Sequence, residues 1–255
     1  RGLIAALANY PLDVKPRVFD ESLSRARIDA QRGIYGFSSG FDKGDYSVWV
    51  FTRNTMPRHP AHFLPRAGSF RIHASGKELV FNIGVDYDAF VNLENSAGAG
   101  PCRVTYQETD MQDGTAVLAL DTSDVYGTVG DAKVSAQRHV AVDLSGRCGA
   151  PLLAAVLDRV RAPGRKTWSL PTGVGTFQYG DEFLRGNRSN GPVRVWDVLR
   201  TKGGTLTRGS RSLFAIGGDR SPTLLGRFVT PAEPQVSFDA HRSKAAWTTM
   251  RVISD

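Results

Sequence analysis

Three of the five histidines lie within one segment, RHPAHFLPRAGSFRIHASGKELVFNIGVDY, which covers residues 58–87. Imidazole titrates near neutral pH and also binds metal ions, so clustered histidines are candidates for proton transfer or for metal ligation. His59 and His62 lie in a proline-containing loop before a predicted strand, and loops on a rigid sheet often carry functional residues. His73 alternates with apolar residues in SFRIHA, which favours an ordinary position on a sheet face.

Motifs of several common enzyme classes do not occur in the chain. The P-loop and H-E-x-x-H are both missing. Two cysteines, Cys102 and Cys148, are too few for a cysteine-based zinc cluster. They could form one disulfide or remain two thiols, because their spacing alone does not show that they are close. His139, beside Arg138 in QRHVAVD, could be either a ligand or a structural residue.

Positive charge is concentrated in one part of the chain, whose net charge is +7. Residues 161–227 carry 12 Lys and Arg against 4 Asp and Glu, whereas residues 1–160 carry 17 against 18. A basic segment of this kind favours an acidic partner such as an anionic glycan, a nucleic acid or a membrane surface. The alternative is an arginine-rich surface that is simply solvated.

Short apolar and aromatic segments separated by turn residues predict an all-β fold. YSVWVF, SFRIHA and ELVFNIG, at 46–51, 69–74 and 78–84, are rich in aromatic and β-branched residues, and similar segments follow to the C-terminus. SGK at 75–77 is expected to form a hairpin turn, because Gly76 adopts a positive φ at little cost. The 27 glycines and 13 prolines are distributed along the chain and fit many turns. We therefore predict a large antiparallel multi-stranded β-sandwich.

The N-terminal segment is expected to differ from the rest. Apolar residues at positions 3, 4 and 7 followed by two prolines predict a short helical remnant. We expect residues 1–30 to be this helical or linker remnant and residues 31–255 to form the sandwich domain. No run of about 18 apolar residues occurs, so no membrane span is expected. The chain begins at Arg1 without a signal peptide, which predicts a processed or excised piece of a longer protein.

Several short motifs occur in a fixed order along the chain. A histidine-containing loop precedes AGSFRIHASGKELVFNIGVDY, and then come DVYGTV, AQRHVAVDLSG and PLLAAVLDRVRAPGRKTWSLPT. In this order they resemble the C-terminal β-sandwich of heparinase II/III-like polysaccharide lyases. In that family a histidine-rich loop leads into Gly-Ser-Phe and a strand, and the second strand of the following hairpin ends in Asp-x-Gly. The resemblance covers roughly residues 30–175.

The chain departs from the family pattern at several positions. The family's loop usually reads His-x-His-x-Asp-x-Gly-Ser-Phe. When the chain is aligned on residues 68–70, His62 matches the first histidine, but Leu64 and Arg66 replace the second histidine and the aspartate. Asn82 stands where the family often has a metal-binding aspartate. Its amide oxygen could still bind a cation, although without the negative charge.

The resemblance implies β-elimination on a uronate-containing glycan. A base removes the proton α to the carboxyl, an acid protonates the leaving glycosidic oxygen, and positive groups stabilise the enolate-like charge. The resemblance implies His62 as base, Tyr126 as acid and Arg66 as the group that neutralises the carboxylate. The structural alternatives are that His62 caps a loop and that Tyr126 packs in the core.

The resemblance also implies further sites and partners. The residues expected to bind the glycan are Arg58, His59 and Arg138. A divalent cation, zinc or calcium, would have as its ligands His62, Asn82 and His139. An α/α-toroid domain is expected upstream, and the location is expected to be secreted or periplasmic.

Three functions follow from these observations, in order of preference. The first is the C-terminal sandwich part of a polysaccharide lyase that acts on an acidic polysaccharide. The alternative is a non-catalytic glycan-binding or structural β-sandwich domain. The third is a nucleic-acid-binding module, for which residues 161–227 supply aromatic and basic side chains. A nucleic-acid partner is not expected, because no RNA-binding signature is present.

Overall fold

The fold was analysed in a computed structural model of the chain. The described residues are 23–42, 44–52, 67–80, 90–98, 100–172, 176–179, 182–184, 213–217, 224–229, 235–241 and 247–254. Among them the strands run from β1 to β19, every strand pair is antiparallel, and the helical element is the short α2, Ser123–Tyr126. The predicted all-β, antiparallel multi-stranded fold is confirmed.

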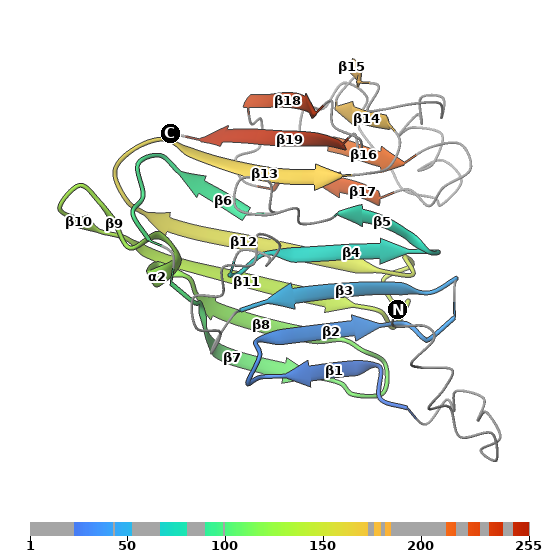
Figure 1. Ribbon diagram of the computed structural model, residues 1–255. Coiled ribbons are helices and arrows are strands. Elements are labelled where there is room, and N and C mark those ends of the chain that lie inside the picture. Colours follow the sequence, from blue (N-terminus) through green and yellow to red (C-terminus); the bar gives the residue numbers. More distant parts are fainter. Residues whose placement is uncertain are drawn as a thin grey trace, which may run out of the picture.

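The first sheet is a meander of consecutive strands in the order β1-β2-β3-β4-β5 (Figure 1). Its strands are β1 Ala26–Asp29, β2 Ile34–Ser38, β3 Tyr46–Phe51, β4 Phe70–Ala74 and β5 Lys77–Val80. The sheet begins at Ala26, before the boundary expected at residue 30. The predicted turn is present between β4 and β5: Ser75 has a φ of 48° and Gly76 a φ of 71°. Positive φ at both turn residues is typical of a tight two-residue hairpin.

The second sheet lies against the first and has the order β12-β11-β8-β7. Its strands are β7 Arg103–Thr109, β8 Ala116–Asp121, β11 Ser135–Asp143 and β12 Leu153–Arg161. Buried and more exposed residues alternate along β8 and β11, as expected for a sheet with one face covered and one face open. Between β8 and β11 lie α2 and a small ribbon of β9 Thr128–Val129 and β10 Ala132–Lys133.

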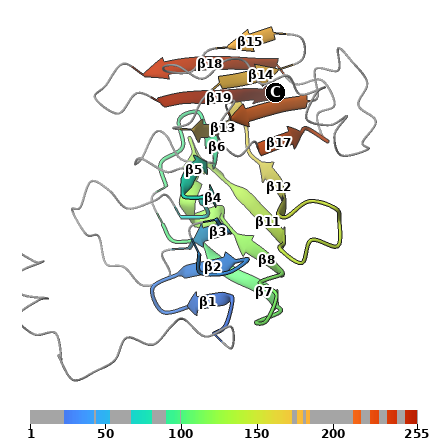
Figure 2. The same cartoon turned by 90° about the vertical axis from the view of Figure 1, so that its right-hand side faces the viewer.

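Two further sheets gather at one end of the sandwich (Figure 2). The third has the order β18-β19-β13-β6, with β6 Phe90–Leu93, β13 Lys166–Thr172, β18 Gln235–His241 and β19 Trp247–Ser254. The fourth has the order β15-β14-β16-β17, with β14 Thr176–Tyr179, β15 Glu182–Leu184, β16 Leu213–Gly217 and β17 Leu224–Arg227. Trp168 of β13 meets Phe228, just after β17, edge to face at 6.2 Å between ring centroids.

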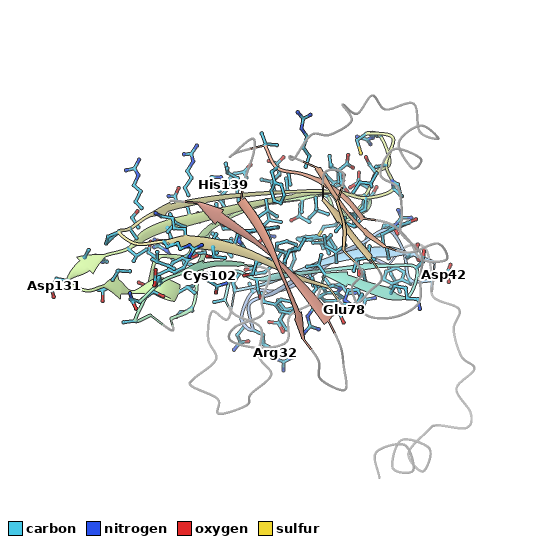
Figure 3. The ribbon with its side chains drawn as sticks, turned by 90° about the horizontal axis from the view of Figure 1, so that it is seen from above. Arg32, Asp42, Glu78, Cys102, Asp131 and His139 are labelled. Carbon is cyan, nitrogen blue, oxygen red and sulfur yellow. The ribbon has the colours of Figure 1, made fainter. Side chains whose placement is uncertain are left out.

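The hydrophobic core fills the space between the first two sheets (Figure 3). Its buried side chains include Phe37, Val48, Val50 and Ile72 from the first sheet and Leu118, Leu120, Val140 and Val142 from the second. Burying each such side chain contributes about 1.5–3 kcal/mol, so this layer dominates the stabilisation. Within the described residues, none of the helices is long and apolar enough to cross a membrane.

Candidate functional site

Most of the predicted site residues lie outside the described residues. These are the histidine-loop residues Arg58, His59, His62 and Arg66, together with Asn82. Their proposed roles therefore stay predictions. The structure instead describes the two positions at which the chain leaves and re-enters the first sheet around this loop, and it describes Tyr126, Arg138 and His139.

The two ends of the histidine loop are held side by side at the edge of β3. The Gly68 N–H donates to the Phe51 carbonyl at 2.6 Å, and the Cys102 N–H donates to the Thr52 carbonyl at 3.0 Å. The first bond closes the base of the loop within the first sheet, and the second ties that base to the segment that enters β7. The loop therefore starts and ends at a fixed place in the sandwich.

Arg138 of β11 lies in the core and reaches this loop base. Its side chain is fully buried and forms a two-bond ion pair with Asp158 of β12, with Nε–Oδ1 at 2.7 Å and Nη2–Oδ2 at 2.8 Å. Its Nη1 donates to the Gly68 carbonyl at 2.7 Å. Burial alone would lower the pKa of Arg138, but the charge and hydrogen bonds of Asp158 raise it above its ordinary value. This guanidinium is thus a cation held inside the protein, with its hydrogen bonds directed at protein atoms.

The inward direction of Arg138 follows from the two-residue period of a strand. Arg138 shares its side of β11 with Ala136, Val140 and Val142, all of which are buried. The expectation that Arg138 binds the glycan is not supported by this position, because a substrate cannot contact a side chain with no exposed surface. The sequence QRHVAVD already indicates this inward direction, because Arg138 is separated by two and four residues from the apolar Val140 and Val142 and therefore lies on the same face of the strand.

Cys102 lies close to this buried ion pair and is a free thiol. Burial is the main cause that raises the pKa of Cys102 to about 12, and the nearby Arg138 charge lowers it only in part. Cys148 is exposed and also free, so the two cysteines are thiols and form no disulfide with each other. The guanidinium carbon of Arg138 also lies 5.8 Å from the centroid of the Phe70 ring, a cation–π contact.

Tyr126, the predicted acid, ends α2 and is 1% exposed. Its hydroxyl donates to the Val91 carbonyl of β6 at 2.9 Å. The Gly98 N–H donates to the Tyr126 carbonyl at 2.6 Å, and a Cβ on Gly98 would lie 2.2 Å from the Tyr126 carbonyl carbon. This geometry favours the alternative in which Tyr126 packs and joins α2 to β6.

His139 points to the opposite side of β11 from Arg138. It is partly exposed on the outer face of the second sheet, whereas Cys102 lies between the layers (Figure 3). Its cross-strand neighbours are Ala119 of β8 and Leu157 of β12, which carry no side-chain ligand atoms. Among the described residues no group of three His, Cys, Asp or Glu could hold a metal ion. His139 therefore has no metal-binding neighbour among the described residues, and the metal site expected with His62 and Asn82 stays a prediction.

His73 is confirmed as a residue of a sheet face. It lies on the partly exposed side of β4, and its Nε2 is 3.7 Å from Glu78 Oε1 of β5. Burial lowers the pKa of His73, the Glu78 carboxylate raises it, and the Arg71 charge lowers it further, with a net shift downward. Arg71 Nη1 is also 3.7 Å from Glu78 Oε1, so these side chains form a small surface cluster.

Comparison with solved structures shows a related fold. One solved structure of a heparinase III gene product matches with a TM-score of 0.60 and 10% identity, over 91% of this chain and 34% of that chain. A heparinase III structure with methylated lysines matches with a TM-score of 0.60 and 11% identity, over 99% of this chain and 36% of that chain. No protein-family model and no curated protein matches the sequence. The chain thus shares the fold of about one third of the heparinase III structures that it matches.

Proposed function

We propose that this chain is the β-sandwich part of a polysaccharide lyase that acts on a uronate-containing glycan by β-elimination. The observation that carries the proposal is the structural match to heparinase III, which extends over 91% and 99% of this chain in the two comparisons. A shared fold alone does not fix an activity. The ordered motifs around residues 58–87 and the basic balance of residues 161–227 add support.

In the proposed reaction His62 is the base and Arg66 neutralises the substrate carboxylate. Removal of the α proton develops negative charge on the carboxylate, which a nearby guanidinium stabilises. Arg58 and His59 contribute binding from the same loop. The bonds of the Gly68 N–H and carbonyl hold the base of this loop against both sheets. Tyr126 does not serve as the acid, because its hydroxyl is engaged inside the sandwich. The leaving glycosidic oxygen takes its proton from solvent water, and the proton that His62 removes returns to solvent.

The chain spans about a third of the heparinase III chains, so cleavage is expected to need further polypeptide. We propose an upstream α/α-toroid as that part and a secreted or periplasmic location, where an extracellular glycan is accessible. The isolated 255-residue chain should then bind the glycan but cleave it poorly, because proton transfer requires a completed geometry.

The test is an absorbance assay for the unsaturated uronate that β-elimination leaves. It is run with the 255-residue chain and with the longest polypeptide that its gene encodes, on heparan sulfate, polygalacturonate and neutral dextran. His62→Ala should lower the cleavage rate of the longer polypeptide by about 10²–10⁴-fold, the usual contribution of a general base. His73→Ala is the matched control, since it removes a histidine from the same region, and should change the rate less than about twofold.

Two results would contradict the proposal. One is the absence of unsaturated product from the longer polypeptide on both acidic glycans. The other is a His62→Ala variant that cleaves at the unaltered rate. Glycan binding without product would support the alternative of a non-catalytic glycan-binding sandwich, which the replacements Leu64, Arg66 and Asn82 favour.

A further inference from the structure

The outer face of the second sheet is an ordered array of side chains that the histidine-loop site does not use. Cross-strand pairing places these side chains in parallel rows. One row crosses all four strands with Leu157, His139, Ala119 and Tyr106. The adjacent row holds Arg159, Gln137, Asp121 and Arg103; it lies two residues along β12, β11 and β8 and three along β7, where the register shifts. Each row spans about 14–15 Å, because neighbouring strands lie about 4.8 Å apart.

The first of these rows is apolar and open to solvent. Tyr106 is 51% exposed and Leu157 is 39% exposed, and Val117 and Leu153, also on this face, are 41% and 49% exposed. Between Tyr106 and Leu157 stand the short side chain of Ala119 and the imidazole of His139. Exposed apolar side chains that gather on one face mark interaction sites more often than scattered ones do.

The carboxylates on this face already accept hydrogen bonds within the protein. Asp121 is paired with Arg103 at 3.2 Å, Glu108 accepts from the Tyr106 hydroxyl, and Asp143 accepts from the Ser145 N–H and hydroxyl. Engagement of this kind leaves these oxygens less available to compete for an incoming cation or hydroxyl group.

The two arginines of β12 on this face, unlike these carboxylates, have no ion-pair partner among the described residues. Arg159 and Arg161 are exposed, and neither has a carboxylate within ion-pair distance among the residues that the structure describes. Arg161 stands opposite Ser135 at the start of β11, and the exposed Lys133 lies just before that strand. Positive charge therefore collects at this end of the face, next to the apolar row.

We propose that this outer face binds an acidic glycan across the strands. The apolar C–H faces of the sugar rings would lie on Tyr106 and Leu157. Gln137 and His139 would hydrogen-bond the hydroxyl groups, and Arg159 with Arg161 would bind carboxylates or sulfates. Arginine binds such planar anions through paired hydrogen bonds, and an exposed tyrosine offers both an apolar ring and a polar end. The ligand class rests on the proposed function, but the residues of this face are none of those assigned to the histidine-loop site.

The experiment measures the affinity of the 255-residue chain for heparan sulfate, polygalacturonate and dextran by calorimetry. Arg159→Ser with Arg161→Ser should weaken binding to both acidic glycans by about tenfold or more, the effect of losing hydrogen bonds to charged groups. The matched control, Arg27→Ser with Arg32→Ser, removes two exposed cations near the first sheet, and its effect should stay below about twofold. Arg32 and His139 lie on opposite sides of the molecule in Figure 3.

A variant with unchanged net charge distinguishes binding at this face from non-specific electrostatic attraction of a polyanion to the whole protein. Leu157→Ser should weaken binding severalfold while leaving the net charge unchanged. Equal losses in the β12 and control arginine variants would overturn the proposal, as would unaltered binding by Leu157→Ser. Light scattering gives a further outcome: a dimer that Leu157→Ser dissociates, with no change in glycan affinity, would overturn it in favour of a second copy as occupant.

The result also separates this inference from the lyase proposal. Binding that depends on Arg159, Arg161 and Leu157, together with no unsaturated product from the longer polypeptide, supports the face and contradicts the lyase activity. Product formation by variants that bind and cleave like the unaltered protein supports the lyase activity and contradicts the face.

Discussion

Removal of the Asp158 carboxylate should destabilise the protein more than almost any other single change in the second sheet. Arg138 is fully buried, and Asp158 supplies the two hydrogen bonds and the negative charge that compensate its burial. In Asp158→Ala the guanidinium keeps only the Gly68 carbonyl among the bonds described above. Leaving one charge of a buried pair without its partner costs about 3–5 kcal/mol. Typical domains are stable by only about 5–15 kcal/mol, so the loss should be large.

Removal of the arginine, in Arg138→Met, should lower the free energy of unfolding by less than Asp158→Ala does. The effects of the two substitutions on this free energy should not be additive. Arg138→Met leaves Asp158, whose side chain is 16% exposed, free to take up water, and it leaves the Gly68 carbonyl without its donor. An orphaned buried acceptor costs about 1–3 kcal/mol. The double variant contains no buried lone charge, so its stability should be close to that of Arg138→Met alone. The coupling energy then equals the cost of Asp158→Ala, about 3–5 kcal/mol, which is at or above the upper end of the range for residues in direct contact.

Urea unfolding followed by circular dichroism gives the free energy of unfolding of each variant by linear extrapolation to zero denaturant. Asp143→Ala, at the partly exposed end of β11, is a control that removes a carboxylate without leaving a buried charge. A loss below about 1 kcal/mol in Asp158→Ala, or strict additivity in the double variant, would refute the reasoning.

Three other outcomes are expected. A thiol reagent should modify Cys148 in the native protein and Cys102 only after unfolding, because burial raises the pKa of Cys102 to about 12; equal rates for both thiols would contradict this. Hydrogen bonds lower the pKa of Asp121, so its contribution to the free energy of unfolding is present above its unfolded-state pKa of about 4 and is lost as pH falls through the lower folded value. Asp121→Asn should therefore make the free energy of unfolding fall less steeply at acid pH. An unchanged pH dependence would argue against this role of Asp121. Gly98→Ala should cost about 1–3 kcal/mol or more through its clash with backbone, whereas Gly44→Ala, which meets nothing within 4 Å, should be near neutral in the same urea assay.

The strands were predictable from the sequence because their pattern is local. Alternation and turn residues located β3, β4, β5 and the Ser75-Gly76 turn, since each depends on neighbouring residues alone. Alternation also predicted that His73 is a residue of a sheet face, although not that it shares this face with Arg71. The third sheet pairs segments far apart in the chain, as β6 with β13 and β13 with β19, and no local pattern specifies such partners.

The roles of the polar residues were harder to predict. The family resemblance implied that Arg138 binds the glycan, but its side chain is fully buried. Its burial depends on Asp158 in the next strand and on the Gly68 carbonyl in the other sheet, and no reading of QRHVAVD alone contains either partner. Tyr126 likewise has its hydroxyl partner on β6, 35 residues earlier in the chain. The roles of the histidine-loop residues remain predictions.

The bond from Arg138 to Gly68 has a mechanical consequence for the sandwich. Apolar contacts between two sheets are non-directional, so small translations of one layer over the other change their energy little. The ion pair with Asp158 fixes the guanidinium on the second sheet, and its third nitrogen then selects one carbonyl at the entrance to β4. Arg138 thus links the two sheets at one point and fixes the position of one sheet relative to the other. Arg138→Met should therefore keep its far-ultraviolet spectrum but lose near-ultraviolet dichroism, because the aromatic side chains between the sheets would sample several offsets.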